Sequence, residues 1–349
     1  MSNSFVVFKK RAQKNINTMA QKAKANNLVF RPHFKTHQNI EIGKLFLKEG
    51  VSFITVSSLN MAKFFSDYGW DDITIAFPLD IGEINEIDQL AKKINLQILI
   101  TNKTHLEHLS SLKNRVGVMI EIDTGYHRTG IDFKKMEEVK SLITDIYAQP
   151  NLFFMGLLSH YGNSYQSRGK EQIEGTYNRS THRLIELQKR LAKELGSVIF
   201  LSIGDTPTTS VVTKFDGIDE IRPGNFVYYD LMQLQIGSCD ISQIAAVVRC
   251  PVVDKNPKEK QLIIHGGAVH FSKEIIDIES PKSYGRVVDT STKNWILSDS
   301  FVSSLSQEHG IVQCTDIDFE KYKIGDLIDI IPVHSCLTAN LMKENTVII

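Results

Sequence analysis

The sequence lacks the features that would mark a secreted, membrane-bound or nucleic-acid-binding protein. Its 40 basic and 40 acidic residues give a formal net charge of zero, so neither a nucleic-acid footprint nor a membrane-surface stripe is indicated. Near the start only a four-residue apolar patch precedes a basic run, which is too short for a secretory signal. No apolar run approaches the length of a membrane span. We therefore expect a soluble, cytoplasmic protein.

Cysteine is scarce and glycine-rich nucleotide loops are missing. The four cysteines, Cys239, Cys250, Cys314 and Cys336, are scattered over the last third of the chain without CxxC spacing. This distribution argues against a framework of disulfides, and any special cysteine must be identified by its neighbours. No GxGxxG or GK[ST] loop follows the first predicted strand, so a dinucleotide or P-loop site lacks its signature.

Apolar, β-branched segments alternate with segments of helical spacing through the first two thirds of the chain. Near-continuous apolar strands separated by helices indicate parallel βα units that are buried on both faces. Eight such strands over about 230 residues predict an α/β fold with a closed (β/α)8 barrel of the TIM type. A doubly wound open sheet is the alternative, because strand count alone does not show closure. The predicted strands are residues 28–35, 52–57, 72–77, 96–101, 116–123, 153–160, 198–203 and 220–228.

The character of the sequence changes after about residue 231. Short, strand-like segments punctuated by turns follow, with hardly a helix among them, which predicts a separate all-β domain. A chain of 349 residues also exceeds the size at which a single core usually stops growing. We predict a barrel domain of residues 1–235 and a C-terminal β domain of residues 236–349.

Lys35 stands between His33 and His37 at the end of the first predicted strand. Lysine amines become nucleophiles when they are desolvated or set beside other cations, and they then form Schiff bases with carbonyl substrates or pyridoxal phosphate. The alternative is a solvated basic loop, since most lysines lie on the surface. Catalytic residues of such barrels follow the strands, and this placement favours Lys35 as a catalytic residue. Nothing in the sequence assigns a role to either histidine.

Two segments near the end of the predicted barrel could bind a phosphate. The segment Gly204-Asp-Thr-Pro-Thr-Thr209 is an ordinary turn and N-cap pattern, but it also offers hydroxyls and backbone N–H groups at a helix start. Gly224 and Asn225 would let the backbone approach the same anion, in the region where these barrels commonly hold phosphate.

The fifth and sixth predicted strands also end in polar residues. Arg128 is either a structural cation paired with Asp123 or a donor to a cofactor ring. His160 and Tyr165 follow the next strand, and Tyr165 either caps the barrel or contacts the cofactor.

His334 and Cys336 follow the apolar segment 327–332. On an extended chain, residues two apart point to the same side, so the imidazole and the thiolate would converge on one cation. Sulfur with imidazole favours zinc, and two protein ligands leave positions open for water or substrate. The alternative is a buried cysteine beside a hydrogen-bonded histidine.

These motifs, taken in order, resemble one known family. The stretches RPHFKTH, EIDTGYHRTG, SHYGNSY, GDTPT, RPGN, SLSQEHG and HSC before LTAN resemble those of the fold type III pyridoxal phosphate enzymes. The D-serine dehydratase and D-threonine aldolase group is most similar, with alanine racemase more distant, and the resemblance spans nearly the whole chain. It implies a barrel with a C-terminal β domain, and a homodimer whose active site is completed across the interface.

The resemblance also implies roles for individual residues. Lys35 would form the Schiff base with pyridoxal 5'-phosphate, and His334 and Cys336 would bind Zn²⁺, with Mn²⁺ or another divalent cation as alternatives. Leu158 stands where dehydratases have a tyrosine, so one contact is missing or replaced. The positions that match cofactor-binding residues are Tyr165, Thr206, Gly224 and Asn225, and the strand ends add Arg128 and His160 as candidates.

The implied activity is that of a D-amino-acid lyase that removes water from a D-β-hydroxy amino acid. Aldolases of the group tend to have a carboxylate as second metal ligand, so Cys336 favours a dehydratase. A D-threonine aldolase-like cleavage and an amino-acid racemase are the alternatives. A non-catalytic protein of pyridoxal homeostasis would share the barrel but would lack the β domain.

Overall fold

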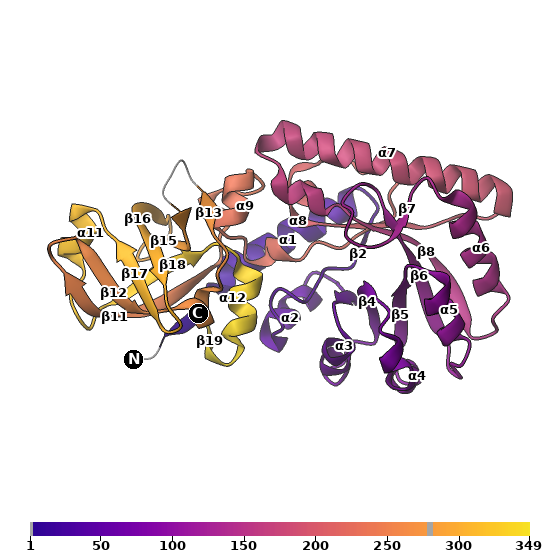
Figure 1. Cartoon of the computed structure of the whole chain (residues 1–349), viewed down its shortest axis with the longest axis horizontal. Coiled ribbons are helices and arrows are strands. Elements are labelled where there is room, and N and C mark those ends of the chain that lie inside the picture. The colour runs from indigo at the N-terminus through magenta and orange to yellow at the C-terminus, as the bar shows by residue number, and fades with distance from the viewer. Residues whose placement is uncertain (1–2, 278–281) are drawn as a thin grey trace. The chain divides into compact units, whose positions relative to one another are not determined.

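The computed structural model describes residues 3–277 and 282–349. Its contacts divide the chain into two compact units. Figure 1 shows the whole chain, coloured by residue number. Unit 1 comprises Met1–Asn17, Thr36–Ile42 and Asn225–Ile349, and unit 2 comprises Thr18–Lys35 and Gly43–Gly224. The boundary expected between residues 235 and 236 stays a prediction. No helix within the two described ranges is long and apolar enough to cross a membrane.

Unit 2 contains the predicted α/β barrel. Eight parallel strands follow the order β2-β10-β9-β8-β6-β5-β4-β3. A parallel bridge between His33 and Thr55 joins the two ends of this order. Around it, Phe34 N donates to Thr55 O at 2.8 Å and Thr55 N donates to Pro32 O at 2.9 Å. The sheet therefore forms a barrel, as predicted, rather than an open doubly wound sheet. The strands are β2 (Val29–Phe30), β3 (Phe53–Val56), β4 (Asp72–Pro78), β5 (Asn95–Ile100), β6 (Val116–Asp123), β8 (Leu152–His160), β9 (Leu201–Gly204) and β10 (Glu220–Ile221).

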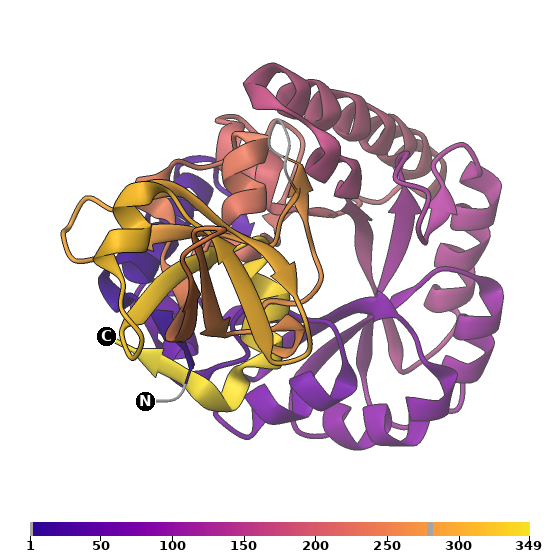
Figure 2. The ribbon, with the colours of Figure 1, turned by 60° about the vertical axis from the view of Figure 1, so that its left-hand side comes forward.

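Helices lie around the outside of these strands (Figure 2). They bury one face, as in α6, whose residues Val139, Leu142 and Ile146 are buried. The helices are α2 (Ile40–Leu47), α3 (Leu59–Ser66), α4 (Ile84–Ala91), α5 (Lys103–Leu109), α6 (Met136–Tyr147), α7 (Gly169–Leu195) and α8 (Thr206–Val211). Helix α1 (Lys9–Ala25) begins in unit 1 and ends in unit 2.

The first and last barrel strands are much shorter than predicted. Strand β2 ends before Pro32, and β10 ends before Pro223, because proline has no N–H for a strand ladder. The two segments stay in contact, since His33 N donates to Pro223 O at 2.8 Å. Beyond Gly224 the predicted strand is replaced by a 3₁₀ turn at Asn225–Val227.

Unit 1 is built on an antiparallel sheet in the order β12-β17-β16-β15-β18-β11-β1-β19, and an extra pairing of β12 with β11 closes six strands into a ring. Strand β1 pairs antiparallel with β11 and parallel with β19, so the first strand of the chain belongs to this sheet. The strands are β1 (Ser4–Val7), β11 (Ala246–Asn256), β12 (Gln261–His265), β15 (Gly285–Asp289), β16 (Ile296–Leu305), β17 (His309–Gln313), β18 (Leu327–Pro332) and β19 (Thr346–Ile348).

The expectation that this part of the chain would have hardly a helix is wrong. Four short helices occur here: α9 (Leu231–Ile236), α10 (Ala268–Phe271), α11 (Asp316–Lys321) and α12 (Ser335–Leu341). None exceeds two turns, and so short a helix leaves no clear apolar period in the sequence.

Candidate active site

In unit 2, the predicted residues gather where strands β6, β8, β9 and β10 end. His160, the last residue of β8, places its Nδ1 at 2.5 Å from the carbonyl of Gly204. A carbonyl only accepts, so Nδ1 carries the proton and Nε2 is an acceptor. Burial, and the positive charges of Lys35 and Arg128, lower the pKa of His160 to about 3. The imidazole is therefore neutral at pH 7, and it lies within electrostatic reach of Lys35 and Arg128.

Thr206 is the first residue of α8, directly after the N-cap residue Asp205. The carboxylate of Asp205 accepts from Thr208 N at 2.7 Å and from Ser164 Oγ at 2.8 Å. Within the described residues, the hydroxyl of Thr206 is fully buried and has no hydrogen-bond partner. A buried polar group without a partner destabilises a fold unless a ligand satisfies it. A phosphate oxygen beside the N–H groups of a helix start would do so, and these residues therefore fit the phosphate of the cofactor.

The loop after β6 carries Arg128. Asp123 does not serve Arg128 as the sequence allowed, because its Oδ1 accepts the N–H groups of Gly125, Tyr126 and His127 at 2.8, 2.9 and 3.1 Å. The guanidinium of Arg128 instead lies 5.2 Å from the ring centroid of Tyr126. The turn held by Asp123 thus presents Arg128 as an exposed cation at the mouth of the barrel.

Tyr165 lies in the 3₁₀ turn Gly162–Gln166 that follows β8. Its ring centroid is 6.4 Å from that of His160. The ring of Tyr126 meets His160 from another direction, edge-on at 5.5 Å. The imidazole is therefore flanked by two aromatic rings, which restrict its orientation.

Glu121 and Arg222 complete this group, although sequence reasoning gave neither a role. Glu121 is buried, and its Oε2 has no hydrogen-bond partner among the described residues. Burial raises the pKa of Glu121, while a hydrogen bond from Thr129 and the charge of Arg128 oppose that shift. Arg222 donates from Nε to Ser202 Oγ at 2.7 Å and from Nη2 to the Ser159 carbonyl. The RPGN motif marks this segment, but the resemblance gave a role to its glycine and asparagine and none to its arginine.

Leu158 packs inside the barrel against Leu99 and Met119. It precedes His160 by two residues in β8, so both side chains point to the same face of that strand. Leu158 is therefore part of an apolar floor and offers no hydrogen bond. Whether a cofactor contact is lost here stays a prediction.

In unit 1, His334 and Cys336 lie at the junction of β18 and α12. The reason given for their convergence is wrong, because the chain is not extended through them: His334 is the N-cap of α12, and Cys336 is already in its first turn. The turn nevertheless keeps the two residues together at the start of α12. Cys336 Sγ also lies 3.2 Å from the hydroxyl of Thr36, the residue that follows Lys35 in the chain.

The chemistry of this pair suits a metal. Burial lowers the pKa of His334, but the interaction with Cys336 and the charge of Asp230 outweigh burial and raise it to about 9, so a metal ion would have to displace a proton from the imidazole. Thiolate with imidazole is a donor set that zinc prefers. These residues fit the predicted metal.

Asp230 anchors the turn that carries His334 and Cys336. Sequence reasoning gave this aspartate no role. Its carboxylate accepts from the backbone N–H of Ser335 at 2.9 Å and from Gln233 N at 2.9 Å. It also accepts from the amide of Asn225 at 2.6 Å. The side chain of the predicted cofactor-binding residue Asn225 is thus tied to the segment that carries His334 and Cys336.

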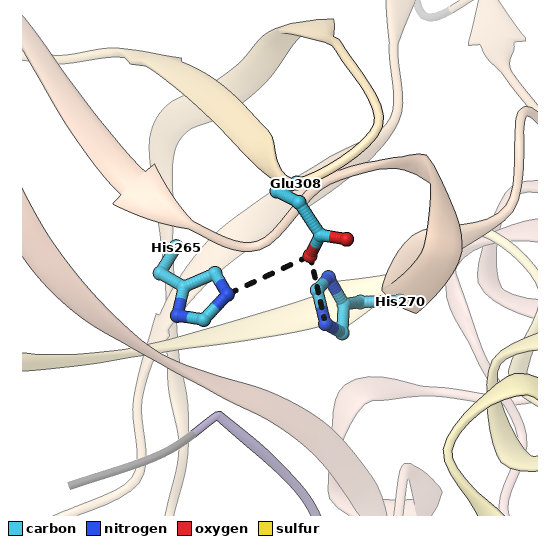
Figure 3. Close-up of side chains that lie close together, drawn as sticks. All are labelled: His265, His270 and Glu308. Atoms are coloured by element: carbon cyan, nitrogen blue, oxygen red, sulfur yellow. Dashed lines mark ion pairs between the residues drawn. The ribbon is translucent and has the colours of Figure 1, made fainter.

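Three further side chains of unit 1 lie close together: His265 at the end of β12, His270 in α10, and Glu308 before β17 (Figure 3). Glu308 Oε2 is 3.6 Å from His265 Nε2 and 3.9 Å from His270 Nε2. However, both ring nitrogens of His270 already face donors of the protein: the N–H of Gly267 donates to Nδ1 at 3.0 Å, and Asn3 Nδ2 lies 2.7 Å from Nε2. These contacts leave His270 no free ring nitrogen for a metal ion, so the cluster is arranged for hydrogen bonds.

Comparison with known proteins agrees with the resemblance read from the sequence. Residues 9–231 match the family described as "Alanine racemase, N-terminal domain", and residues 245–348 match the "Putative serine dehydratase domain". The D-serine dehydratase of Dictyostelium discoideum is 31% identical and covers 95% of this chain and 89% of its own. The D-threo-3-hydroxyaspartate dehydratase of Delftia sp. (strain HT23) is 25% identical, with 94% and 89% covered.

Solved structures show the same fold. The structure of the Delftia D-threo-3-hydroxyaspartate dehydratase has a TM-score of 0.90 at 24% identity, covering 98% of this chain and 92% of that one. The D-threonine aldolase from Filomicrobium marinum has a TM-score of 0.81 at 19% identity, covering 97% and 89%. One further structure of the Delftia enzyme is described as a metal-free form of a cysteine-to-alanine variant.

Proposed function

Because this chain is a lyase-type enzyme that belongs to the alanine racemase N-terminal domain family, we propose that it removes water from a D-β-hydroxy amino acid such as D-serine. The enamine formed by loss of water would then hydrolyse to a keto acid and ammonia. The observation that carries this proposal is the placement of His334 at the N-cap of α12 and of Cys336 in its first turn. Hydroxide is a poor leaving group, and a soft imidazole and thiolate pair suits the Lewis acid that such an elimination requires.

Pyridoxal phosphate, when bound, supplies an electron sink that weakens the bonds at the substrate α-carbon. The residues that would hold it are in unit 2. Thr206, whose buried hydroxyl has no protein partner, would bind its phosphate together with the start of α8 and Gly224. Tyr165 and Arg128 would flank the ring.

Lys35 would act as the general base. Its amine, once free, would take the α-proton of the substrate, which is a usual role for a lysine of this kind. His160 stays neutral at pH 7 and presents Nε2 as an acceptor. It would therefore orient a nearby donor without adding a positive charge.

A divalent cation, when bound, polarises an oxygen so that it leaves more readily. His334 and Cys336 would hold zinc, or Mn²⁺ or another divalent cation in its place. Asp230 would fix the strand-to-helix turn that presents both ligands, since it accepts the N–H of Ser335 between them. The formation of a homodimer stays a prediction.

Product analysis tests the proposal. Purified protein would be incubated with D-serine, D-threonine and D-threo-3-hydroxyaspartate, with their L-enantiomers, and with and without a strong chelator. We expect pyruvate and ammonia from D-serine, a loss of activity with chelator, and recovery on adding Zn²⁺. Glycine and acetaldehyde from D-threonine would instead indicate an aldolase, and formation of the enantiomer alone a racemase. Full activity in protein shown by elemental analysis to be metal-free would exclude the role of His334 and Cys336.

A further inference from the structure

A network of hydrogen-bonded polar side chains runs through the interior of the unit 2 barrel. Arg31 Nε donates to Glu220 Oε2 at 2.7 Å, and its Nη1 donates to Asp72 Oδ1 at 2.5 Å. The other oxygen of Glu220 accepts from Ser202 Oγ at 2.6 Å. Ser202 Oγ in turn accepts from Arg222 Nε at 2.7 Å. The first residue of the Arg31–His37 motif is thus connected, through a carboxylate and a hydroxyl, to the arginine of the RPGN motif.

The four central members of this network are buried. Arg31, Glu220 and Arg222 are each at most 5% exposed, and Ser202 is fully buried. Charges taken out of water destabilise a fold unless they are paired and hydrogen-bonded. Glu220 and Asp72 meet that condition for Arg31, since their charges outweigh the effect of burial and raise its pKa. A simpler barrel would have aliphatic side chains here, so the presence of these charges calls for another explanation.

This network crosses a part of the barrel where the strands pair over few residues. Strands β2 and β10 pair over only two residues each, Val29 with Glu220 and Phe30 with Ile221. Arg31 directly follows β2 and precedes Lys35 by four residues, while Arg222 directly follows β10. The side chains therefore supply, in this seam, the register that a short ladder of backbone hydrogen bonds leaves weakly specified.

We propose that Arg31, Glu220 and Ser202 are positioning residues that fix the orientation of Arg222 and its register with the segment carrying Lys35. Arg222 lies within the candidate site, since it donates to the carbonyl of Ser159 and packs against Gly204. Glu220 also supplies a negative charge behind that guanidinium, so it sets the positive field that Arg222 presents to a bound cofactor. This inference rests on the proposed cofactor site, and it names residues that act on that site through Arg222.

Two variants separate positioning from a merely structural role. Ser202→Ala removes the link between Glu220 and Arg222 but leaves the pairing of Arg31 with Glu220. Glu220→Gln removes the charge at nearly constant shape. The matched control is Thr74→Val. Thr74 donates to Gln97 at 3.0 Å in the same barrel interior, and neither residue belongs to the network. Each purified variant would be freed of cofactor and titrated with pyridoxal phosphate.

We expect Ser202→Ala and Thr74→Val to lower Tm by a similar amount, about 2–4 °C. Only Ser202→Ala should raise the dissociation constant of pyridoxal phosphate, by roughly tenfold, because it frees a charged donor. Glu220→Gln should move the pH midpoint of the visible cofactor band to lower pH by about half a unit or more, since loss of a negative charge disfavours a nearby protonated group. Thr74→Val should leave both quantities at the wild-type values.

The outcomes are distinguishable. If Ser202→Ala lowers Tm but changes neither the dissociation constant nor the pH midpoint, the network has only a structural role and the inference is wrong. The same conclusion follows if Thr74→Val changes them equally. If Glu220→Gln does not fold, Ser202→Ala still decides. If the wild-type protein itself binds no pyridoxal phosphate, the proposed function fails instead.

Discussion

The two units enclose different kinds of interior. Strand β12 of unit 1 alternates the buried aliphatic residues Leu262 and Ile264 with more exposed ones. Unit 1 also buries carboxyl groups, such as those of Asp230 and Asp329, but the barrel of unit 2 buries arginines as well, Arg31 and Arg222, together with Glu220. Aliphatic side chains inside a closed ring of strands stabilise the fold through the apolar area that they remove from water. A polar interior lowers stability unless each charge is paired. The difference indicates that unit 2 gives up some stability in order to hold a charged site.

The largest expected effect separates the functions of the two units. Lys35→Ala in unit 2 should lower activity by at least about 10²–10⁴-fold, since the general base is lost. It should also abolish covalent attachment of the cofactor while leaving the metal content unchanged. Cys336→Ala in unit 1 should do the opposite, lowering the bound metal measured by elemental analysis and keeping the visible cofactor band.

His265→Ala is the control for the metal assignment, because its cluster is arranged for hydrogen bonds. It should retain the metal content of the wild type. If Lys35→Ala protein still shows a cofactor band that borohydride fixes covalently, Lys35 is not the attachment residue. If His265→Ala loses metal and Cys336→Ala keeps it, the metal site has been placed wrongly.

A second prediction concerns the stability of the two interiors. Arg31→Met would leave Glu220 and Asp72 without their shared partner, and breaking such a buried pair costs about 3–5 kcal/mol. Ile330→Val in the ring of unit 1 removes one methylene group and should cost about 0.5–1.5 kcal/mol. Urea denaturation of each variant measures the free energy of unfolding. Equal losses would show that the charges of the barrel are no more critical than its apolar neighbours.

The smallest expected effect is a difference in pH dependence. Burial raises the pKa of Asp205 in unit 2 to about 6, so the native state holds its proton more tightly than the unfolded chain. Its contribution to stability is therefore complete below about pH 4 and is lost as the pH rises through 6, by at most about 3 kcal/mol. Relative to Asp205→Asn, the wild type should lose stability over this range in denaturation experiments.

Asp289 in unit 1 should show the opposite sign. Hydrogen bonds from Lys321 and Ser291 lower its pKa, so its contribution is present at neutral pH and is lost as the pH falls below about 4. The comparison with Asp289→Asn should be made on the same scale. Two variants with pH dependences of the same sign would contradict the contrast between the buried and the paired carboxyl group.

The barrel strands were predictable because parallel strands covered on both faces are apolar in nearly every residue. The ends of β2 and β10 were not, although Pro32 and Pro223 stand in the sequence. A proline permits a strand edge as well as a strand end, and only the structure shows which occurs. The separate β domain was predictable from alternation, but the placement of β1 in it depends on a pairing with β11 about 240 residues away.

The candidate site was predictable where a residue type carries chemistry by itself. Lys35, His334 and Cys336 are of that kind, and the assignments of their roles stay predictions. Arg222, Glu121 and Asp230 were missed because their importance lies in their partners, which come from distant segments of the chain. The reason for expecting His334 and Cys336 to converge was wrong, since a helix start takes the place of the expected extended chain.

The pairing of β1 with β11 and β19 has a consequence for synthesis of the chain. Phe5 lies opposite Thr346 and Val248, so β1 finds its neighbours only after the segments that carry β11 and β19 have been made. Unit 2, whose segments lie between residues 18 and 224, can fold while β1 still waits. Contacts of such long sequence separation form slowly, and we expect the sheet of unit 1 to be the last part of the protein to assemble.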